Sequence, residues 1–137
     1  MENKDFLLIL FPILTAILSS YLTYFFAIKS KQKEAMLKFK EEKYTNLIIA
    51  LQGFVGSTVS TQKKKLFFEE HYKSWLYSTD EVVKNINDLI ASVENGKTPD
   101  PLEGRKLIGN IILAMRKDLL GSTSLMNVDF RYIDIID

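Results

Sequence analysis

The chain contains no cysteine, which excludes a disulfide framework, a thiolate zinc site and a cysteine nucleophile. Histidine occurs once, as His71, and no Gly-x-Ser-x-Gly motif accompanies it to support a serine triad. Gly53 and Gly56 lack the lysine and hydroxyl residue that a phosphate-binding P-loop requires. The sequence therefore predicts no enzyme, no cofactor, no metal site and no small-molecule substrate.

An excess of charge of one sign is also missing. The 18 lysines and arginines nearly balance the 17 acidic residues, for a formal net charge of +1. A dedicated nucleic-acid binder usually carries a clear basic excess, so we expect no nucleic-acid partner. The three consecutive lysines at 63–65 are interpreted as the solvated start of a helix.

One long stretch, residues 6–28, has no charge at all and is apolar apart from scattered hydroxyl groups. A bilayer core of about 30 Å needs roughly 20 apolar residues at 1.5 Å per residue, and this stretch is long enough. We expect residues 1–28 to form an N-terminal transmembrane anchor, with Pro12 inside the span.

Lysines follow this stretch closely, whereas the residues before it are nearly neutral. Positive charge marks the cytoplasmic side of a span, which predicts an external N-terminus and a cytoplasmic C-terminal domain. The same lysines are predicted to contact an anionic leaflet, worth on the order of 1 kcal/mol each. Their role as a plain orientation signal is the competing interpretation. They are Lys29, Lys31, Lys33, Lys38 and Lys40.

Small and hydroxylated side chains share one face of the predicted span. Thr15, Ser19 and Thr23 recur at a spacing of four, with Ala16 and Ser20 beside them. Such a face allows close approach of two helices in lipid, which predicts self-association. In the competing interpretation the hydroxyls donate to carbonyls of the preceding turn and face lipid.

Residues 29–121 predict an all-α cytoplasmic bundle of about four antiparallel helices. The first continues to about Gln52, and its apolar stripe is Leu37, Tyr44, Ile48, Leu51 and Val55, widened by Met36, Leu47 and Phe54. The second is capped by Ser60 or Thr61 and runs to Tyr77. Its predicted inward face starts with Leu66 and Phe67 and consists of Phe68, Tyr72, Trp75 and Leu76.

Two more helices complete the predicted bundle. The third follows acidic residues at 80–81, ends near Asn95-Gly96 and has apolar positions Val82, Val83, Ile86, Leu89, Ile90 and Val93. The fourth begins at Pro101, ends at Gly121 and has its predicted buried side at Leu102, Leu107, Ile108, Ile111, Ile112, Met115 and Leu119.

Residues 122–137 are too apolar for a plain disordered tail, so we expect part of this tail to dock on the bundle. Residues 132–136 pairing as a strand with another chain is the alternative. Arg116 and Asp118 cannot pair as helical neighbours, and each is therefore free to reach another helix or the tail. Arg116 with Asp129 or Asp134 is the predicted internal clamp. His71 is interpreted as a residue at the edge of the core.

The stretches at 75–84, WLYSTDEVVK, and 113–121, LAMRKDLLG, resemble small bacterial single-pass membrane-anchored helical proteins of unassigned function. The resemblance covers roughly residues 33–130. It implies one N-terminal helix followed by a helical bundle, a location in the bacterial inner membrane, and no catalytic residues. Some proteins of this sort resemble components of phage-defence systems.

These patterns together favour a non-enzymatic, membrane-anchored interaction or scaffold protein. We expect it to bind anionic lipid at the cytoplasmic face, together with a partner protein or copies of itself. The alternative is a membrane-perturbing effector whose transmembrane helices cluster through Thr15, Ser19 and Thr23.

Overall fold

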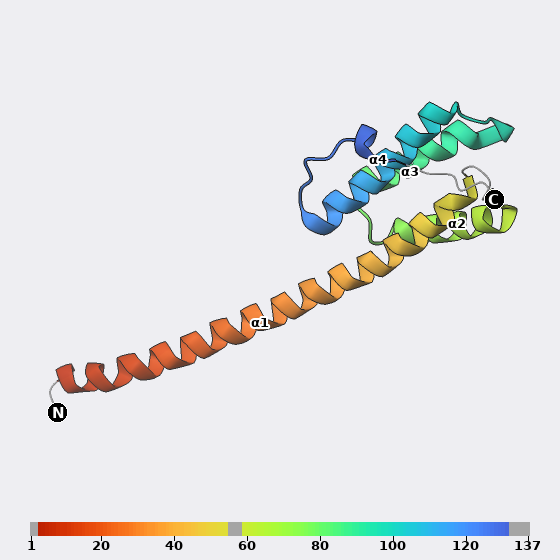
Figure 1. Ribbon diagram of the computed structural model, residues 1–137. Helices are drawn as coiled ribbons and strands as arrows, with labels where there is room; N and C mark the ends of the chain where they lie inside the picture. Colours follow the sequence, from red (N-terminus) through yellow and green to blue (C-terminus); the bar gives the residue numbers. More distant parts are fainter. Residues whose placement is uncertain (1–2, 55–58, 132–137) are drawn as a thin grey trace. The chain divides into compact units, whose positions relative to one another are not determined.

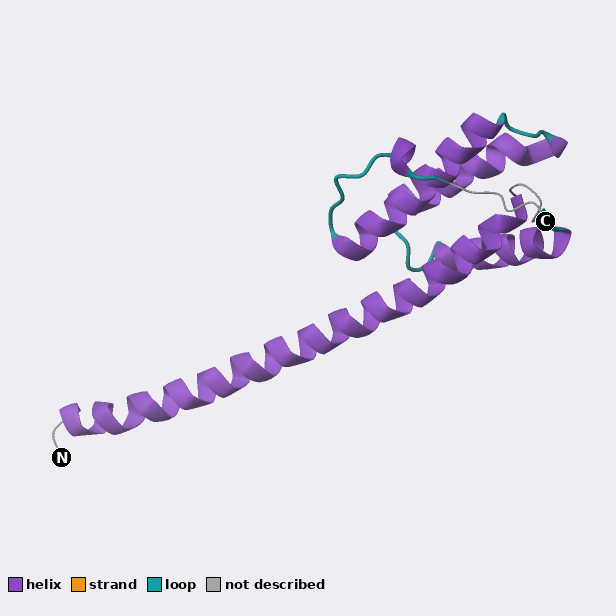
Figure 2. Ribbon diagram, viewed as in Figure 1, coloured by secondary structure: helices purple, strands orange, loops and turns teal. Residues whose placement is uncertain are grey.

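The computed structural model describes residues 3–54 and 59–131 of the chain, and regular structure in these residues is entirely helical (Figure 2). The α-helices are α1 Asn3–Leu51, α2 Thr61–Ser74, α3 Asp80–Val93 and α4 Pro101–Leu120 (Figure 1). Short 3-10 helices are η1 Gln52–Phe54, η3 Glu94–Gly96 and η4 Asn127–Asp129. The prediction of an all-α chain with four helices is confirmed for the described residues.

The chain divides into two compact units, and the boundary lies between Lys38 and Phe39. Helix α1 continues without interruption through residue 28, where the sequence alone suggested that the anchor ends. The end of the apolar stretch is therefore a change in side-chain chemistry within one helix, and tertiary packing begins only at Phe39.

In the first unit, the apolar side chains of residues 6–28 have almost no neighbours to cover them and are largely exposed. Pro12 lies inside the helix without ending it. Among the described residues, α1 is the one helix long and apolar enough to cross a membrane. Continuous apolar exposure of this extent is unfavourable in water, so the first unit requires an apolar environment or a partner.

The second unit has its own hydrophobic core, to which all four α-helices contribute. Helices α3 and α4 pack along each other (Figure 1), and burying one large apolar side chain contributes about 1.5–3 kcal/mol. The core consists of Tyr44, Leu47, Ala50 and Leu51 of α1, Phe67 of α2, Val82, Ile86 and Leu89 of α3, and Ile111, Ala114 and Met115 of α4. The apolar positions predicted for the third helix are all buried or partly buried, as expected.

The predicted starts of α2 and α4 and the predicted end of α4 are confirmed, whereas α2 ends at Ser74 and not at Tyr77 as predicted. The Ser60 hydroxyl caps α2 by accepting from the backbone N–H of Lys63, and the Asp100 carboxylate caps α4 by accepting from that of Leu102. Gly121 ends α4 with a φ of 83°, a left-handed conformation that glycine adopts without steric cost.

The predicted inward face of α2 is correct at Phe67 and Phe68, which are buried in or packed against the core, and wrong beyond them. Tyr72, Trp75 and Leu76 are 71%, 60% and 89% exposed, whereas the buried side of the helix consists of Phe67, Glu70, His71 and Ser74. Helix α2 ends at Ser74, so helical spacing does not apply to the two residues after it. The polar residues on the buried side have hydrogen-bond partners, and these bonds offset the desolvation cost of burying polar groups.

The apolar stripe predicted on the first helix is correct only in part. Tyr44 and Leu51 are buried, but Leu37 is only partly covered and Ile48 lies at the surface. Val55 lies outside the described residues. Leu47, predicted to widen the stripe, is fully buried, and Ala50, which was not predicted, faces the core as well.

A buried carboxylate joins the second half of α1 to the last turn of α4. The Lys40 ammonium lies 2.9 Å from both oxygens of Asp118, and the Tyr44 hydroxyl donates to Asp118 Oδ2. The side chains of Lys40 and Asp118 are 16% and 8% exposed. Lys40 was predicted to contact the membrane surface. Its ammonium is instead paired with Asp118, a carboxylate of α4 that is far from it along the chain.

We expect Asp118→Asn to lower the free energy of unfolding by about 2 kcal/mol, because it leaves the Lys40 ammonium uncompensated in a partly buried site. The measurement is urea unfolding of the full chain in detergent micelles, followed by circular dichroism. Glu42→Gln is the control, since Glu42 pairs with Lys43 at the surface and its loss should cost less than about 0.5 kcal/mol. Equal effects of the two substitutions would contradict the assignment.

Candidate binding groove on α4 and η4

A groove of about 870 Å³ lies between the first turns of α4 and the segment that contains η4. Leu102 and Val128 in its lining are each 73% exposed. Three cationic side chains line the groove with these apolar groups, and no carboxylate is among the described lining residues. The lining residues are Leu102, Arg105, Lys106, Asn127, Val128, Phe130 and Arg131.

The wall formed by η4 is held against α4 by one close backbone approach. The Asn127 amide donates to the side-chain oxygen of Asn110 over 2.8 Å. A Cβ atom added at Gly109 would lie only 2.9 Å from the Asn127 carbonyl oxygen. Glycine in the middle of a helix lowers helix stability by roughly 0.5–1 kcal/mol relative to alanine. Gly109 is nevertheless required here, because only glycine leaves room for the Asn127 carbonyl oxygen.

Segment 122–131 lies beside α4 and is ordered by hydrogen bonds within the segment and to α4. The Asp129 carboxylate accepts from the backbone N–H of Met126 over 2.8 Å, and the Arg116 Nε donates to the Thr123 hydroxyl over 3.3 Å. Docking of the tail is thereby seen as far as residue 131. Residues 132–137, to which the predicted strand pairing refers, lie outside the described residues.

The predicted internal clamp is not formed by the described residues. Arg116 and Asp129 have the separate partners just named, and Asp134 lies outside the described residues. The prediction that Asp118 would reach another helix is confirmed, since its partners Lys40 and Tyr44 belong to α1. Arg116, correspondingly, reaches the tail.

His71 is a buried core residue, as expected. Its Nε2 lies 3.2 Å from the Asn87 side-chain oxygen, and its ring stacks on Phe67 with the centroids 6.2 Å apart. Burial lowers its pKa below the ordinary value, because the charged imidazolium would lose solvation. Among the described residues, no three histidine or acidic side chains gather where they could hold a metal ion.

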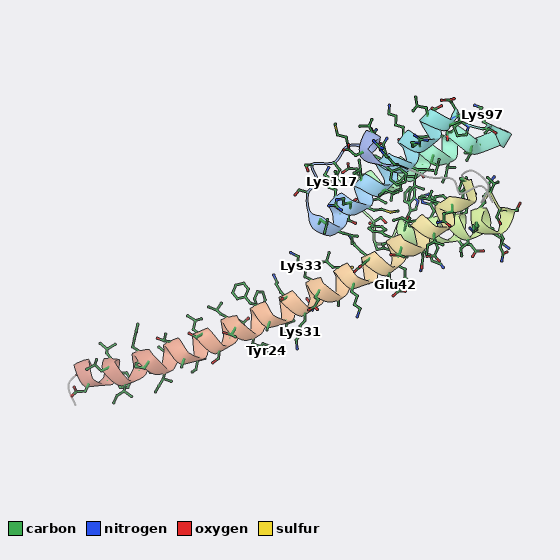
Figure 3. All side chains as sticks on the ribbon, in the orientation of Figure 1. Tyr24, Lys31, Lys33, Glu42, Lys97 and Lys117 are labelled. Carbon is green, nitrogen blue, oxygen red and sulfur yellow. The ribbon has the colours of Figure 1, made fainter. Side chains whose placement is uncertain are left out.

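The remaining predicted site residues lie on α1. Lys29, Lys31, Lys33 and Lys38 are exposed, and Lys31 and Lys33 project from different sides of the helix (Figure 3). The Lys29 ammonium lies 4.7 Å from the centre of the Phe25 ring, a cation–π contact just beyond the apolar stretch.

On the predicted packing face, the two threonine hydroxyls donate to their own helix. Thr15 bonds to the Phe11 carbonyl over 2.7 Å and Thr23 to the Ser19 carbonyl over 2.8 Å. Ala16, Ser19 and Ser20 are exposed beside them. These bonds match the interpretation in which the hydroxyls satisfy themselves within the helix, and self-association stays a prediction.

The groove was missed by the sequence argument. Leu102 was assigned to the buried side of its helix, and Arg105, Lys106 and Arg131 were not singled out. The available signal was glycine inside a helical pattern at Gly109. Such glycines commonly mark a close approach of another segment.

Gly109→Ala should displace η4 from α4, since the Asn127 carbonyl oxygen leaves no room for a Cβ. We expect faster amide hydrogen exchange in residues 123–131 of the variant. Gly104→Ala is the matched control on the same helix, because its Cβ would meet only Pro99 Cγ at 3.8 Å. That change should leave exchange in the segment unaltered and stabilise α4 by up to about 1 kcal/mol. Unchanged exchange in Gly109→Ala would refute the docking contact.

Acid should destabilise the second unit through His71. Its pKa is lowered in the folded state, so the unfolded chain binds the proton more readily and stability is lost as the pH falls below the unfolded pKa of 6.5. Urea unfolding between about pH 7.5 and 5 should show this decline. Because the chain has no other histidine, His71→Gln should flatten the profile. A profile that is the same in both proteins would disprove the assignment.

Comparison with protein-family models, with curated proteins and with solved structures finds no match to this chain. The resemblance of residues 75–84 and 113–121 to small membrane-anchored bacterial proteins therefore stays a prediction. Functional inference depends on the geometry of the groove and on the chemistry of α1.

Proposed function

We propose that this protein is a non-enzymatic, single-pass membrane anchor that recruits a partner protein through the groove on α4 and η4. The observation that supports this most directly is the lining itself, in which Arg105, Lys106 and Arg131 surround apolar Leu102 and Val128. Cationic groups around exposed apolar side chains match a protein segment that carries both carboxylates and apolar residues.

The anchor in this proposal is the apolar first part of α1. Its length and apolar surface suit a bilayer, and the exposed lysines at 29, 31, 33 and 38 follow it directly. By the positive-inside rule these lysines support an external N-terminus and a second unit on the cytoplasmic side of a bacterial inner membrane. They also support contact with anionic lipid headgroups.

The proposed partner is an acidic, partly apolar peptide segment of another protein. Arginine binds carboxylates through two parallel hydrogen bonds, which gives orientation as well as attraction. A groove of this size supports only modest affinity, but anchoring both proteins at one membrane raises their effective concentration. A role in phage defence, implied by the resemblance, is one setting in which such recruitment operates.

A second open cavity is less suited to binding a charged partner than the α4–η4 groove. It is about 460 Å³ in volume and is lined by residues that include Glu81, Asn85 and Lys117. Glu81 and Lys117 lie 2.7 Å apart and neutralise each other. This cavity therefore has no unbalanced charge to select a partner.

The rival function, membrane perturbation by clustered α1 helices, has weaker support. Packing through Thr15 and Thr23 would gain most if their hydroxyls needed interhelical partners. Both hydroxyls already donate to carbonyls within α1. Homo-oligomerisation through this face is accordingly secondary in the proposal.

Charge reversal in the groove should abolish recruitment. With a photo-crosslinking amino acid at exposed Val128 in native membranes, we expect a discrete adduct whose yield falls about tenfold in Arg105→Glu. Lys65→Glu is the matched control, since it makes the same charge change on exposed α2 surface. An adduct equally strong in Arg105→Glu, or no adduct at Val128, would overturn the proposal.

A further inference from the structure

Exposed apolar side chains gather at one end of the second unit. Trp75 and Leu76 follow the last residue of α2, and Leu120 is the last residue of α4. All three are exposed, together with Phe39 on α1. None of them belongs to the groove proposed to bind a partner.

Two contacts place these residues at the end of the unit that contains Phe39. The Tyr77 ring packs on the Phe39 ring with the centroids 5.4 Å apart, which holds the turn after α2 beside the first residue of the unit. Asp118 pairs with Lys40, which holds the last turn of α4 there too. Figure 1 shows the turn between α2 and α3 and the final turn of α4 at the same end of this unit.

This end is also close to the apolar stretch along the chain. From Ile28 to Phe39 the chain is continuous helix, which spans about 17 Å. The polar headgroup layer of a bilayer adds several ångströms beyond each face of the hydrocarbon core. The second unit therefore begins within about 17 Å of the apolar stretch, and a tilt of α1 in the bilayer brings the side toward which it leans closer to the headgroups.

The side chains at this end suit a headgroup layer. Tryptophan and tyrosine rings favour the membrane–water boundary, where an apolar ring and a polar edge are both satisfied. Trp75 leans on His71 with the ring centroids 6.4 Å apart, so one edge is supported by the protein while 60% of the residue is exposed. Leu76, at 89% exposed, is the most exposed large hydrophobic residue described in the chain.

We propose that Trp75, Leu76 and Leu120 dock the second unit onto the headgroup layer of the bilayer that holds α1. This inference rests on the proposed membrane anchor. The bilayer is the occupant because the tether keeps it adjacent, and because Trp with exposed leucine at the membrane-proximal end matches its boundary chemistry. The docking fixes which end of the unit faces lipid.

The single tryptophan of the chain reports on this directly. The full chain is reconstituted in phosphatidylcholine–phosphatidylglycerol vesicles, with and without brominated acyl chains near the headgroups. We expect at least twofold quenching of Trp75 fluorescence by the brominated lipid, and protection of Trp75 from acrylamide. Leu76→Glu should remove both effects without unfolding the unit, since Leu76 makes little contact with the core.

A matched control moves the reporter to the other end of α4. In Trp75→Phe with Leu102→Trp, the new tryptophan occupies an exposed position and should be quenched by acrylamide but not by brominated lipid. Quenching of both positions by lipid would indicate non-specific adsorption and overturn the proposal.

The two proposals fail in different ways. If the chain leaves the vesicles in a carbonate wash, the anchor is wrong and the docking falls with it. If the chain stays with the vesicles while Trp75 remains open to acrylamide, the docking alone is wrong. Trp75 that is protected from acrylamide yet unquenched by brominated lipid is covered by protein instead, which also refutes the docking.

Discussion

One helix must satisfy two environments, and the rest of the molecule follows from that constraint. Residues 6–28 of α1 carry no charge and are largely exposed among the described residues, whereas from Tyr44 to Leu51 the same helix buries one stripe in a protein core. A stripe can be covered by three neighbouring helices, but an apolar surface all around a helix needs lipid or another chain. The change from one condition to the other occurs in the lysine-rich segment between them.

The features predictable from the sequence are those that depend on neighbouring residues. Ser60 begins a helix and Gly121 ends one where expected, because capping requires only residues within one turn. The face of α2 was wrong because its polar residues had to be weighed without their partners. His71, for example, is buried beside Asn87. Asn87 lies on another helix, and no local pattern points to it.

The predicted site residues divide in the same way. Lys31 and Lys40 look alike in the sequence, yet Lys31 is exposed and Lys40 is paired with Asp118. Only the tertiary fold brings that carboxylate to α1. The groove depends similarly on Gly109, which lets the backbone of η4 lie against α4. A helical glycine suggests a close approach, but the sequence does not say which segment makes it.

Helix α4 connects the two proposed surfaces. Its 20 residues extend about 30 Å, with Leu102 and Arg105 of the groove in the first two turns and Leu120 at the last residue. If the end with Trp75 and Leu120 meets the headgroups, lipid contact and the groove lie at opposite ends of α4. The cationic side chains of the groove then remain available to a protein segment, since electrostatic attraction to anionic lipid is screened over roughly 10 Å at moderate ionic strength. The docking would thereby separate lipid contact from partner binding within a unit of modest size.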